Sequence, residues 1–450
     1  MKWIKIIFIS LLLFFSLLPS ISFYSIGERE TKNQNDANTG KDAGNVIGEA
    51  FSVEEGVYKG TLEEKDIDWY RFNVGYDRII KIRVLSSLTL YLKAELIDKN
   101  NEVKEVLNSE YSNKVRELVY NGGKGSWFLK IQSVSGNGFY SFSLYTKVNV
   151  KNLVAKVSYT SLFETTNDLV NFGTRFSFTT QCDRAANYIY SKFSSFGLKT
   201  EYDNFIYNGD YYGSRFQGSI LKNVIATKPG KNNTNNAVYI ISAHYDSRSE
   251  NADSSLISAP GADDDASSVA AVIETARILS EYEFDSTIKF IAFSGEEQWL
   301  QGSEHYAKNA KNRGENIKGV INYDMVSYKN KVDIVGDEKS RALVEFMKNI
   351  KQKYGISAPF LNINFYAGED VAHRYWGSDH TSFQKYGYPA VVGFEASLDP
   401  EIWHQRYNPN YHKTTDTVDK LNFELLSLVT KLTLASLAEL AENKIDELLS

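Results

Sequence analysis

Strand-like and helix-like segments alternate along the second half of this chain, and this alternation constrains its fold more than any other feature. Short apolar runs at residues 237–243, 287–293, 317–323 and 389–394 predict strands, and longer segments at 266–281, 302–311 and 422–449 predict helices. In the segment 266–281, Val269, Val272, Ile273 and Ala276 recur on one helical face. The pattern predicts an open, mostly parallel, doubly wound α/β sheet with helices on both faces.

Side chains that can bind metals or move protons follow several of these predicted strands. His244, Glu296-Glu297 and Asp324 each come directly after an apolar run, and Asp264 comes just before a predicted helix. Open α/β sheets place their ligand sites beyond the carboxyl ends of the strands. With His412, these residues form a set of two imidazoles and three carboxylates, with one further glutamate beside them. We therefore expect them to meet in one site.

Each candidate has an ordinary structural explanation when it is taken alone. His244 could be a hydrogen-bonded core histidine, and the Asp263-Asp264-Asp265 run could stabilise a helix N-terminus. Together, however, imidazole and carboxylate groups are zinc ligands, and the single cysteine, Cys182, excludes a thiolate-rich metal site. A carboxylate at the helix start, such as Asp264, can bridge two metals about 3.5–4 Å apart. The set therefore predicts a two-zinc centre for hydrolysis by metal-activated water.

The two adjacent glutamates are expected to have different roles. Neighbouring side chains diverge, so Glu296 and Glu297 cannot easily ligate the same metal. One of them can then act as a general base that takes the proton of the attacking water. The spacing of the residues does not decide which glutamate has which role. Asp246, two residues after His244, is suited to orient that imidazole.

A series of short motifs gives this half of the chain a specific resemblance. They are His244-Tyr-Asp-Ser247, Gly261-Ala-Asp-Asp-Asp-Ala-Ser267, Gly295-Glu-Glu297, Asn322-Tyr-Asp-Met325, Ser378-Asp-His380 and Tyr411-His412. In this order, across roughly residues 223–421, they resemble the dizinc aminopeptidases of metallopeptidase family twenty-eight, of the bacterial leucyl aminopeptidase type. The resemblance implies the zinc exopeptidase fold and a cofactor of two zinc ions per chain.

The resemblance also implies a role for each site residue. The ligands of one zinc ion would be His244 and Asp324, those of the other Glu297 and His412, with Asp264 shared. Glu296 would be the general base, and Asp246 the outer partner of His244. Tyr375 would stabilise the negative charge that develops on the carbonyl oxygen, with Tyr411 as the alternative.

The remaining residues of these motifs are expected to support the site or to lie apart from it. Asp379 and His380 are expected to be scaffolding, and Ser267-Ser268, where the family usually has Ser-Gly, is expected to affect helix packing only. Aromatic residues near Phe365-Tyr366 and Trp376 are candidates for an apolar pocket that holds the first residue of the substrate. The histidines expected to be surface or packing residues are His305, His373 and His404.

The first half of the chain divides into three segments of different character. Residues 1–22, with two lysines before an apolar run, predict a signal peptide, with an uncleaved membrane anchor as the alternative. Residues 23–48 are polar and predict a flexible linker. Residues 49–150 predict a small all-β sandwich, which resembles the bacterial pre-peptidase C-terminal-type domain. Residues 151–450 would form the dizinc peptidase domain.

These features lead us to expect an exported, secreted or extracytoplasmic, zinc-dependent aminopeptidase that acts on peptides with a free N-terminus. A carboxypeptidase- or dipeptidase-like exopeptidase on the same scaffold is the first alternative, because one sequence does not reveal the edge of the pocket. A glutaminyl-cyclase-like enzyme and a non-catalytic binding protein are less favoured, because both ligand sets and the base are present. The net charge of −6 argues against nucleic acid as a partner, and no stable membrane insertion is expected after signal cleavage.

Overall fold

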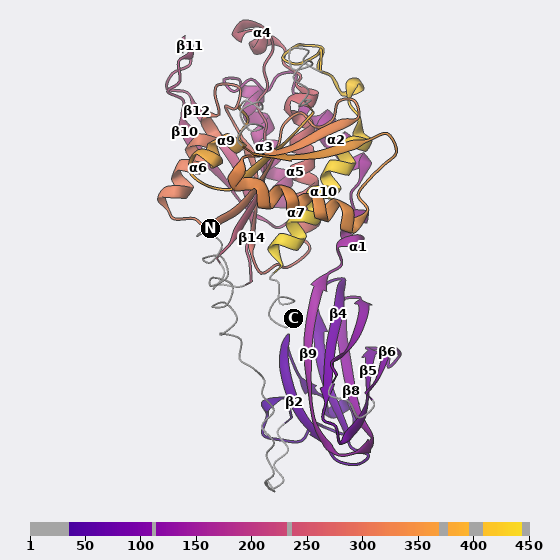
Figure 1. Ribbon diagram of the computed structural model, residues 1–450. Coiled ribbons are helices and arrows are strands. Elements are labelled where there is room, and N and C mark those ends of the chain that lie inside the picture. Colours follow the sequence, from indigo (N-terminus) through magenta and orange to yellow (C-terminus); the bar gives the residue numbers. More distant parts are fainter. Residues whose placement is uncertain (1–35, 110–113, 232–235, 369–376, 396–407, 443–450) are drawn as a thin grey trace, which may run out of the picture.

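The computed structural model describes residues 36–109, 114–231, 236–368, 377–395 and 408–442, which form two domains stacked end to end (Figure 1). The predicted signal peptide, residues 1–22, lies outside these ranges, as do His373, His404, Tyr375 and Trp376. Across the ranges that are described, none of the helices combines the length and the hydropathy of a membrane span.

The smaller, N-terminal domain is a sandwich of two β-sheets. One sheet has the strand order β1-β3-β8-β5-β6 and the other the order β2-β9-β4-β7. In β4, Ile80, Ile82 and Val84 are buried between the sheets, while the residues that alternate with them are partly exposed. The predicted all-β sandwich is therefore confirmed. Its strands are β1 (Phe51–Ser52), β2 (Gly56–Leu62), β3 (Ile67–Val74), β4 (Arg78–Ser86), β5 (Leu90–Asp98), β6 (Val103–Ser109), β7 (Arg116–Gly122), β8 (Gly125–Gly136) and β9 (Gly138–Val148).

The residues just before the first strand pack against this sandwich. Asp36 is fully buried, and its carboxylate accepts hydrogen bonds from the backbone N–H groups of Ala43 (3.0 Å) and Thr61 (2.8 Å). Ala43 is itself part of the sandwich core. Residues 36–48, which the sequence predicts as part of a flexible linker, are therefore held by the sandwich instead. Their polar composition gives no sign of these hydrogen bonds, because the partner strand lies elsewhere in the sequence.

Asp68 in β3 is a buried acid in the same domain. Its side chain is fully buried, and the hydroxyl of Tyr140 donates a hydrogen bond of 2.5 Å to its Oδ2. Burial raises the pKa of Asp68 from 3.8 to about 9, and the nearby carboxylates of Asp36 and Asp66 add to the shift. The folded state therefore holds a proton here that the unfolded chain has already lost. Because loss of this proton favours the unfolded state, the free energy of unfolding falls as the pH rises from about 4 to about 9.

We expect Asp68→Asn to stabilise the protein relative to wild type, by an amount that grows as the pH is raised from about 5 to about 9. Asparagine keeps the shape and the acceptor for Tyr140, but it has no charge to bury. Thermal melting of both proteins at several pH values measures the difference. A variant whose relative stability stays constant, or falls, over this range would show that Asp68 is ionised in the fold.

The larger domain is built on one eight-stranded sheet with the order β10-β12-β14-β13-β15-β18-β16-β17. The pairs β14–β13, β13–β15, β15–β18 and β16–β17 are parallel, whereas β10–β12, β12–β14 and β18–β16 are antiparallel. This mixed sheet confirms the predicted open, mostly parallel α/β fold. Its strands are β10 (Lys199–Ile206), β12 (Ile220–Lys228), β13 (Val238–His244), β14 (Thr287–Phe293), β15 (Ile317–Tyr323), β16 (Lys331–Gly336), β17 (Asn362–Ala367) and β18 (Ala390–Phe394). The short strand β11 (Tyr211–Ser214) comes between β10 and β12 in the sequence.

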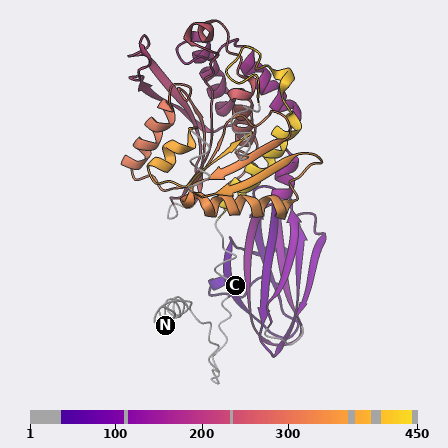
Figure 2. The same ribbon diagram turned by 45° about the horizontal axis from the view of Figure 1, so that its top comes forward.

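Helices cover both faces of this sheet (Figure 2). Helices α2, α3, α5, α7 and α10 share one continuous core with the central strands, and α6 and α9 pack on the other face. The helices are α1 (Val150–Ala155), α2 (Tyr159–Val170), α3 (Thr180–Ser195), α4 (Ala252–Ile257), α5 (Ser268–Leu279), α6 (Gln301–Asn312), α7 (Arg341–Tyr354), α9 (His380–Lys385) and α10 (Phe423–Ala441). Shorter helical turns are η1 (Asp36–Asn38), η2 (Ile47–Glu49), η3 (Ala262–Ser267), η4 (Glu338–Ser340) and η5 (Val418–Lys420).

Two predicted helices differ from the observed ones at one end. Helix α5 begins at Ser268 rather than at residue 266, because the preceding residues form the separate π-helical turn η3. Helix α10 ends at Ala441, whereas the sequence predicts a helix to residue 449. Glu442 leaves the helical conformation (φ −79°, ψ 128°), and its carboxylate accepts a hydrogen bond of 3.0 Å from the backbone N–H of Val148.

Contacts around Glu442 join the two domains. The guanidinium of Arg78 lies 3.0 Å from the Glu442 carboxylate and donates a hydrogen bond of 2.7 Å to the main-chain oxygen of Glu283. Beside them, the rings of Tyr76 and Tyr282 lie 5.5 Å apart. Glu283 precedes β14, so the sandwich is attached at the amino end of that strand and of its parallel neighbour β13.

Candidate metal centre

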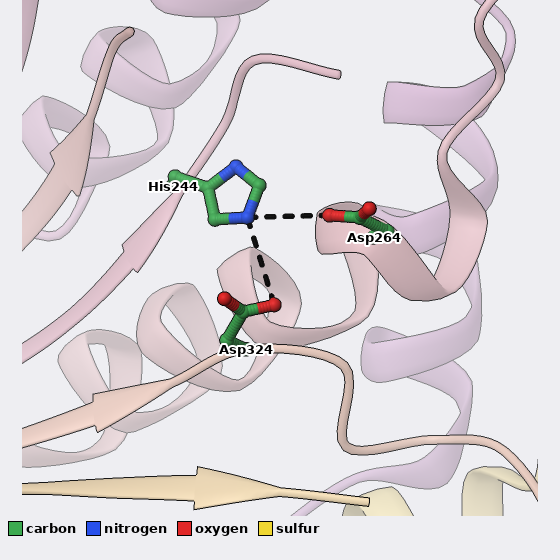
Figure 3. Close-up of side chains that lie close together, drawn as sticks. All are labelled: His244, Asp264 and Asp324. Atoms are coloured by element: carbon green, nitrogen blue, oxygen red, sulfur yellow. Dashed lines mark ion pairs between the residues drawn. The ribbon is translucent and has the colours of Figure 1, made fainter. Parts of the chain in front are cut away.

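One group of potential metal ligands lies at the carboxyl ends of β13 and β15. His244, the last residue of β13, has its Nε2 3.3 Å from Asp264 Oδ1 and 3.7 Å from Oδ1 of Asp324, which directly follows β15 (Figure 3). The pairing of β13 with β15 brings the strand ends together, and Asp264 enters from the turn η3. One ligand atom from each residue lies within 4.8 Å of the other two.

A second group of ligands shares Asp264 with the first. Asp264 Oδ2 lies 3.2 Å from His412 Nε2, which lies 3.1 Å from Glu297 Oε2. One ligand atom of each of these residues again lies within 4.8 Å of the others. The two oxygens of Asp264 thus face different imidazoles. The structure therefore brings together all of the predicted ligands, in two groups that share one carboxylate.

The ligand atoms themselves show whether zinc fits this site. Two ligands that each lie about 2.0–2.1 Å from a tetrahedral zinc ion are about 3.3 Å apart, and the contacts of the two imidazoles measure 3.1–3.7 Å. Among the residues described, the buried atoms His244 Nε2 and Glu297 Oε1 make no hydrogen bond, although buried polar atoms are normally paired. Imidazole and carboxylate donors in two groups with a shared member therefore fit two zinc ions.

The turn that carries Asp264 is shaped by Gly261 and Arg175. Gly261 has a φ of +50°, and a Cβ atom there would lie 2.2 Å from the main-chain oxygen of Asp264, so only glycine fits. Arg175 is fully buried and donates hydrogen bonds of 2.6 Å to the main-chain oxygens of Pro260 and Gly261. A third bond, 2.8 Å long, reaches the main-chain oxygen of Tyr245, directly after His244. Arg175 thus ties the turn to β13.

The acids on either side of Asp264 connect the segments of the site. The Asp265 carboxylate accepts hydrogen bonds from the backbone N–H groups of His244 (3.3 Å) and Met325 (3.2 Å), at the ends of β13 and β15. Asp263 accepts one of 3.0 Å from the N–H of Ser327. These buried acids are therefore not simple helix-capping residues, which was the structural explanation that the sequence allowed. The run has no regular period, so its three roles were not predictable.

Asp416 also holds this turn in place. Its carboxylate accepts hydrogen bonds of 3.1 Å from the backbone N–H groups of both Asp263 and Asp264. Asp416 lies four residues after His412, so this contact also holds the chain segment that supplies the imidazole. The sequence patterns assign Asp416 no role, because its partners are more than 150 residues away in the sequence.

Asp246 has a wider role than the orientation of one imidazole. Nδ1 of His244 lies 3.1 Å from the main-chain oxygen of Asp246 and 3.6 Å from its carboxylate. That carboxylate is fully buried and accepts a hydrogen bond of 2.8 Å from the hydroxyl of Ser177. It also accepts bonds of 3.3 Å from the backbone N–H groups of Glu296 and Glu297. Asp246 therefore positions the glutamate pair as well as His244.

Negative charge is concentrated around the centre. Glu296 Oε2 lies 3.9 Å from His244 Nε2. Burial raises the pKa of Glu296 well above its usual range, and although the His244 charge opposes this shift, Asp324 and Glu297 add to it. Burial lowers the pKa of His412, but the charges of Glu297 and Asp264 and the hydrogen bonds to them together outweigh burial and raise that pKa to about 9. Buried carboxylates need compensating cations, and metal ions in the two ligand groups would supply them.

Two tyrosines were candidates to stabilise charge on the substrate. The ring of Tyr411 stacks on that of His412, with centroids 3.6 Å apart. Burial raises the pKa of Tyr411, and the charges of Asp264 and Glu297 raise it further, so its hydroxyl stays protonated and can donate a hydrogen bond. Tyr375 lies outside the described residues.

Other residues of the motifs are placed as supports or away from the centre. Asp379 is fully buried before α9, and burial raises its pKa to about 7. Burial lowers the pKa of His380 to about 3, so this imidazole is neutral. His305 lies 3.1 Å from Asp203 on the edge of the sheet, as a packing residue. The segment Phe365-Tyr366, a candidate for the substrate pocket, belongs to the outermost strand β17.

Arg248 is a site residue that the sequence did not reveal. Its Nε donates a hydrogen bond of 2.8 Å to Glu297 Oε2 and lies 3.2 Å from His412 Nε2. Its guanidinium lies over the ring of Tyr211, 5.8 Å from the centroid. Its position four residues after His244 was the only available signal, and arginines near a strand end are too common to single one out.

Comparison with known proteins supports the chemistry of this centre. Residues 223–437 match the family described as Peptidase family M28. The C-terminal domain belongs to this family. A protein named "Probable zinc metalloprotease" from Pyrenophora tritici-repentis is 29% identical over 334 residues, 65% of this chain and 76% of that protein. "Leucine aminopeptidase 1" from Coccidioides posadasii is 33% identical over 233 residues, 48% of this chain and 55% of that protein.

The fold of the M28 domain is shared with solved structures. The zinc aminopeptidase BSAP from Bacillus subtilis superposes with a TM-score of 0.53 at 17% identity, over 64% of this chain and 96% of that chain. The resemblance to family twenty-eight and the zinc exopeptidase fold are therefore confirmed. The M28 domain also makes this protein an enzyme of the metallo-exopeptidase class, as the sequence predicts.

Proposed function

We propose that this protein is an exported aminopeptidase that hydrolyses N-terminal residues from peptides with two zinc ions. The observation that carries the proposal is the pair of ligand groups that share Asp264, with Glu296 beside them but in neither group. His244 and Asp324 would hold one ion, and Glu297 and His412 the other. Export rests on the apolar segment at residues 1–22 alone.

The residues around the centre would have separate roles in hydrolysis. When bound, the zinc ions would supply a nucleophile at neutral pH and polarise the scissile carbonyl group. Glu296 accepts the proton of the attacking water and passes it to the leaving amine. Asp246 holds the backbone of Glu296 so that this carboxylate faces the centre. A tyrosine hydroxyl, from Tyr375 or Tyr411, donates to the carbonyl oxygen as negative charge develops on it.

Action at the amino end of the substrate is supported by two observations. Relatives of this M28 domain are named leucine aminopeptidases. In addition, the partly buried Glu296 and the fully buried Asp379 lie near the centre but belong to neither ligand group. Such acids attract the ammonium group of a peptide N-terminus and repel a C-terminal carboxylate.

The test is a measurement of zinc content together with product analysis. We expect about two zinc ions per purified chain and release of free amino acids from the amino end of unblocked peptides. N-acetylated versions of the same peptides should resist cleavage, because they lack the ammonium group. Equal cleavage of acetylated peptides contradicts the aminopeptidase assignment. Release from the carboxyl end would point to a carboxypeptidase, and formation of pyroglutamate to a glutaminyl-cyclase-like enzyme.

A further inference from the structure

Trp299 occupies an unfavourable position two residues after Glu297. Its side chain is 66% exposed, and its φ of +69° lies in the left-handed region, as does that of Leu300 (+58°). Residues other than glycine rarely adopt this backbone conformation, and a large aromatic side chain gains stability when it is buried. Strained backbone of this kind is concentrated at functional sites, where it holds a side chain in a required position.

The turn around Trp299 is closed by hydrogen bonds within the segment that carries the glutamate pair. The backbone N–H of Leu300 donates to the main-chain oxygen of Glu296 (2.9 Å), and that of Gln301 to the main-chain oxygen of Gly295 (2.8 Å). The side-chain amide of Gln301 donates a third bond, of 3.2 Å, to the main-chain oxygen of Trp299. Trp299 is therefore fixed relative to Glu296 and cannot relax its strain independently.

The indole of Trp299 is connected to the metal centre through Tyr211 and Arg248. The rings of Trp299 and Tyr211 meet edge to face, with centroids 5.7 Å apart. The Arg248 guanidinium lies over the ring of Tyr211, and Arg248 Nε donates a hydrogen bond to the predicted ligand Glu297. Tyr211 lies in β11, which projects beyond the sheet at the same end as α4 (Figure 1). An aromatic pair thus stands beside the ligand group of Glu297 and His412.

Tyr211 packs against a cluster of aromatic rings. The neighbouring ring of Tyr212 lies 4.6 Å from Tyr211 and packs edge to face against Phe176 (5.5 Å) and Phe216 (5.8 Å). Phe216 in turn stacks on Phe178 at 4.1 Å. Tyr211 therefore rests on a packed base, and the Trp299–Tyr211 pair is a rigid surface that can bind a ligand at little cost in conformational entropy.

We propose that Trp299 and Tyr211 bind the side chain of the second residue of the substrate, and that the enzyme prefers peptides with an aromatic or bulky apolar residue there. This inference rests on the proposed aminopeptidase function. An exopeptidase encloses the residue that it removes and leaves the rest of the peptide towards solvent, where the exposed indole stands. The guanidinium of Arg248 carries N–H groups suited to a carbonyl oxygen of the same part of the peptide.

The test compares leucinamide, Leu-Phe-amide and Leu-Gly-amide as substrates of the zinc-loaded enzyme. Wild type should show a kcat/KM about tenfold higher for Leu-Phe-amide than for Leu-Gly-amide, as one aromatic contact provides. In Trp299→Gly this ratio should fall to about one, mainly through a higher KM for Leu-Phe-amide. Trp299→Phe, which keeps a ring, should retain most of the preference. Wild type that releases no leucine from any of the three substrates refutes the proposed function instead.

Phe360 offers a matched control for Trp299→Gly. It is also a strongly exposed aromatic residue (89%) with a positive φ (+65°), and it precedes the outermost strand β17. Glycine relieves the same backbone strain at both positions, so each variant should melt about 2 °C above wild type. Only Trp299→Gly should change the preference between the two dipeptide amides. The inference is overturned if the preference is unchanged in Trp299→Gly, or if it changes equally in Phe360→Gly. A Trp299 that binds a partner protein instead of the substrate would give the first of these results.

Discussion

Glu296→Gln should lower kcat about 10³-fold and leave the zinc content at about two ions per chain. The amide keeps the size of the side chain and its place near His244, 3.9 Å away in the structure, but it cannot accept a proton from the attacking water. Because Glu296 is in neither ligand group, removal of its charge should not release metal. The measurements are steady-state kinetics on an unblocked peptide and elemental analysis of the same preparation.

Glu297→Gln is the contrasting variant, since the neighbouring residue belongs to the ligand group of His412. This variant should lose metal from that group, and its activity should recover in part when zinc is added in excess. The pair of variants separates the two roles that the spacing of the glutamates leaves open. Full activity in Glu296→Gln, or metal loss in that variant alone, would reverse the roles of the two residues.

Asp264→Asn should abolish activity and weaken the binding of both zinc ions by more than about 100-fold, which is the upper effect of losing an outer partner. Asp264 presents one oxygen to each imidazole, 3.3 Å from His244 and 3.2 Å from His412. An asparagine has one oxygen and no charge, so it cannot serve both groups. Zinc at about 100 times its dissociation constant stabilises a protein by about 2.7 kcal/mol, and this gain should vanish in the variant.

Thermal melting with and without zinc measures this effect directly, and it does not depend on activity. Asp253→Asn, on the surface of α4, provides a charge-matched control, because Asp253 forms an exposed ion pair with Arg215. The control should keep the full zinc-dependent rise in melting temperature. A zinc-dependent rise in Asp264→Asn equal to that of wild type would mean that Asp264 does not link the two ligand groups.

The fold was predictable where it depends on local patterns of apolar residues in the sequence. Strands β14 and β15 begin and end where the apolar runs do, because buried strands of this kind form short, mostly apolar segments. The antiparallel additions β10 and β12 were not named, and Glu442 was assigned to a helix that stops before it. Glu442 leaves the helix to contact Arg78 and Val148. Such contacts arise between residues about 300 or more positions apart, which no local period records.

The site was predictable to the extent that its ligands follow strands. The ends of neighbouring strands necessarily meet at one edge of a sheet, so His244 and Asp324 could be expected to converge. The residues that hold the ligands were not predictable. Asp265 and Arg175 act through hydrogen bonds to backbone groups, and backbone groups leave no mark in the sequence. Arg248 was missed for a different reason, because its partners are side chains from other segments of the chain.

Helix α5 connects the metal centre with the contact that joins the two domains. It begins next to the turn of Asp264 and ends shortly before Tyr282, which contacts the sandwich through Tyr76. Its 12 residues span about 18 Å at about 1.5 Å per residue. The contact between the two domains therefore lies about one helix length from the metal centre. The metal centre lies at the carboxyl ends of β13 and β15, whereas the sandwich is attached at the amino ends of β13 and β14, so the two lie at opposite ends of the sheet.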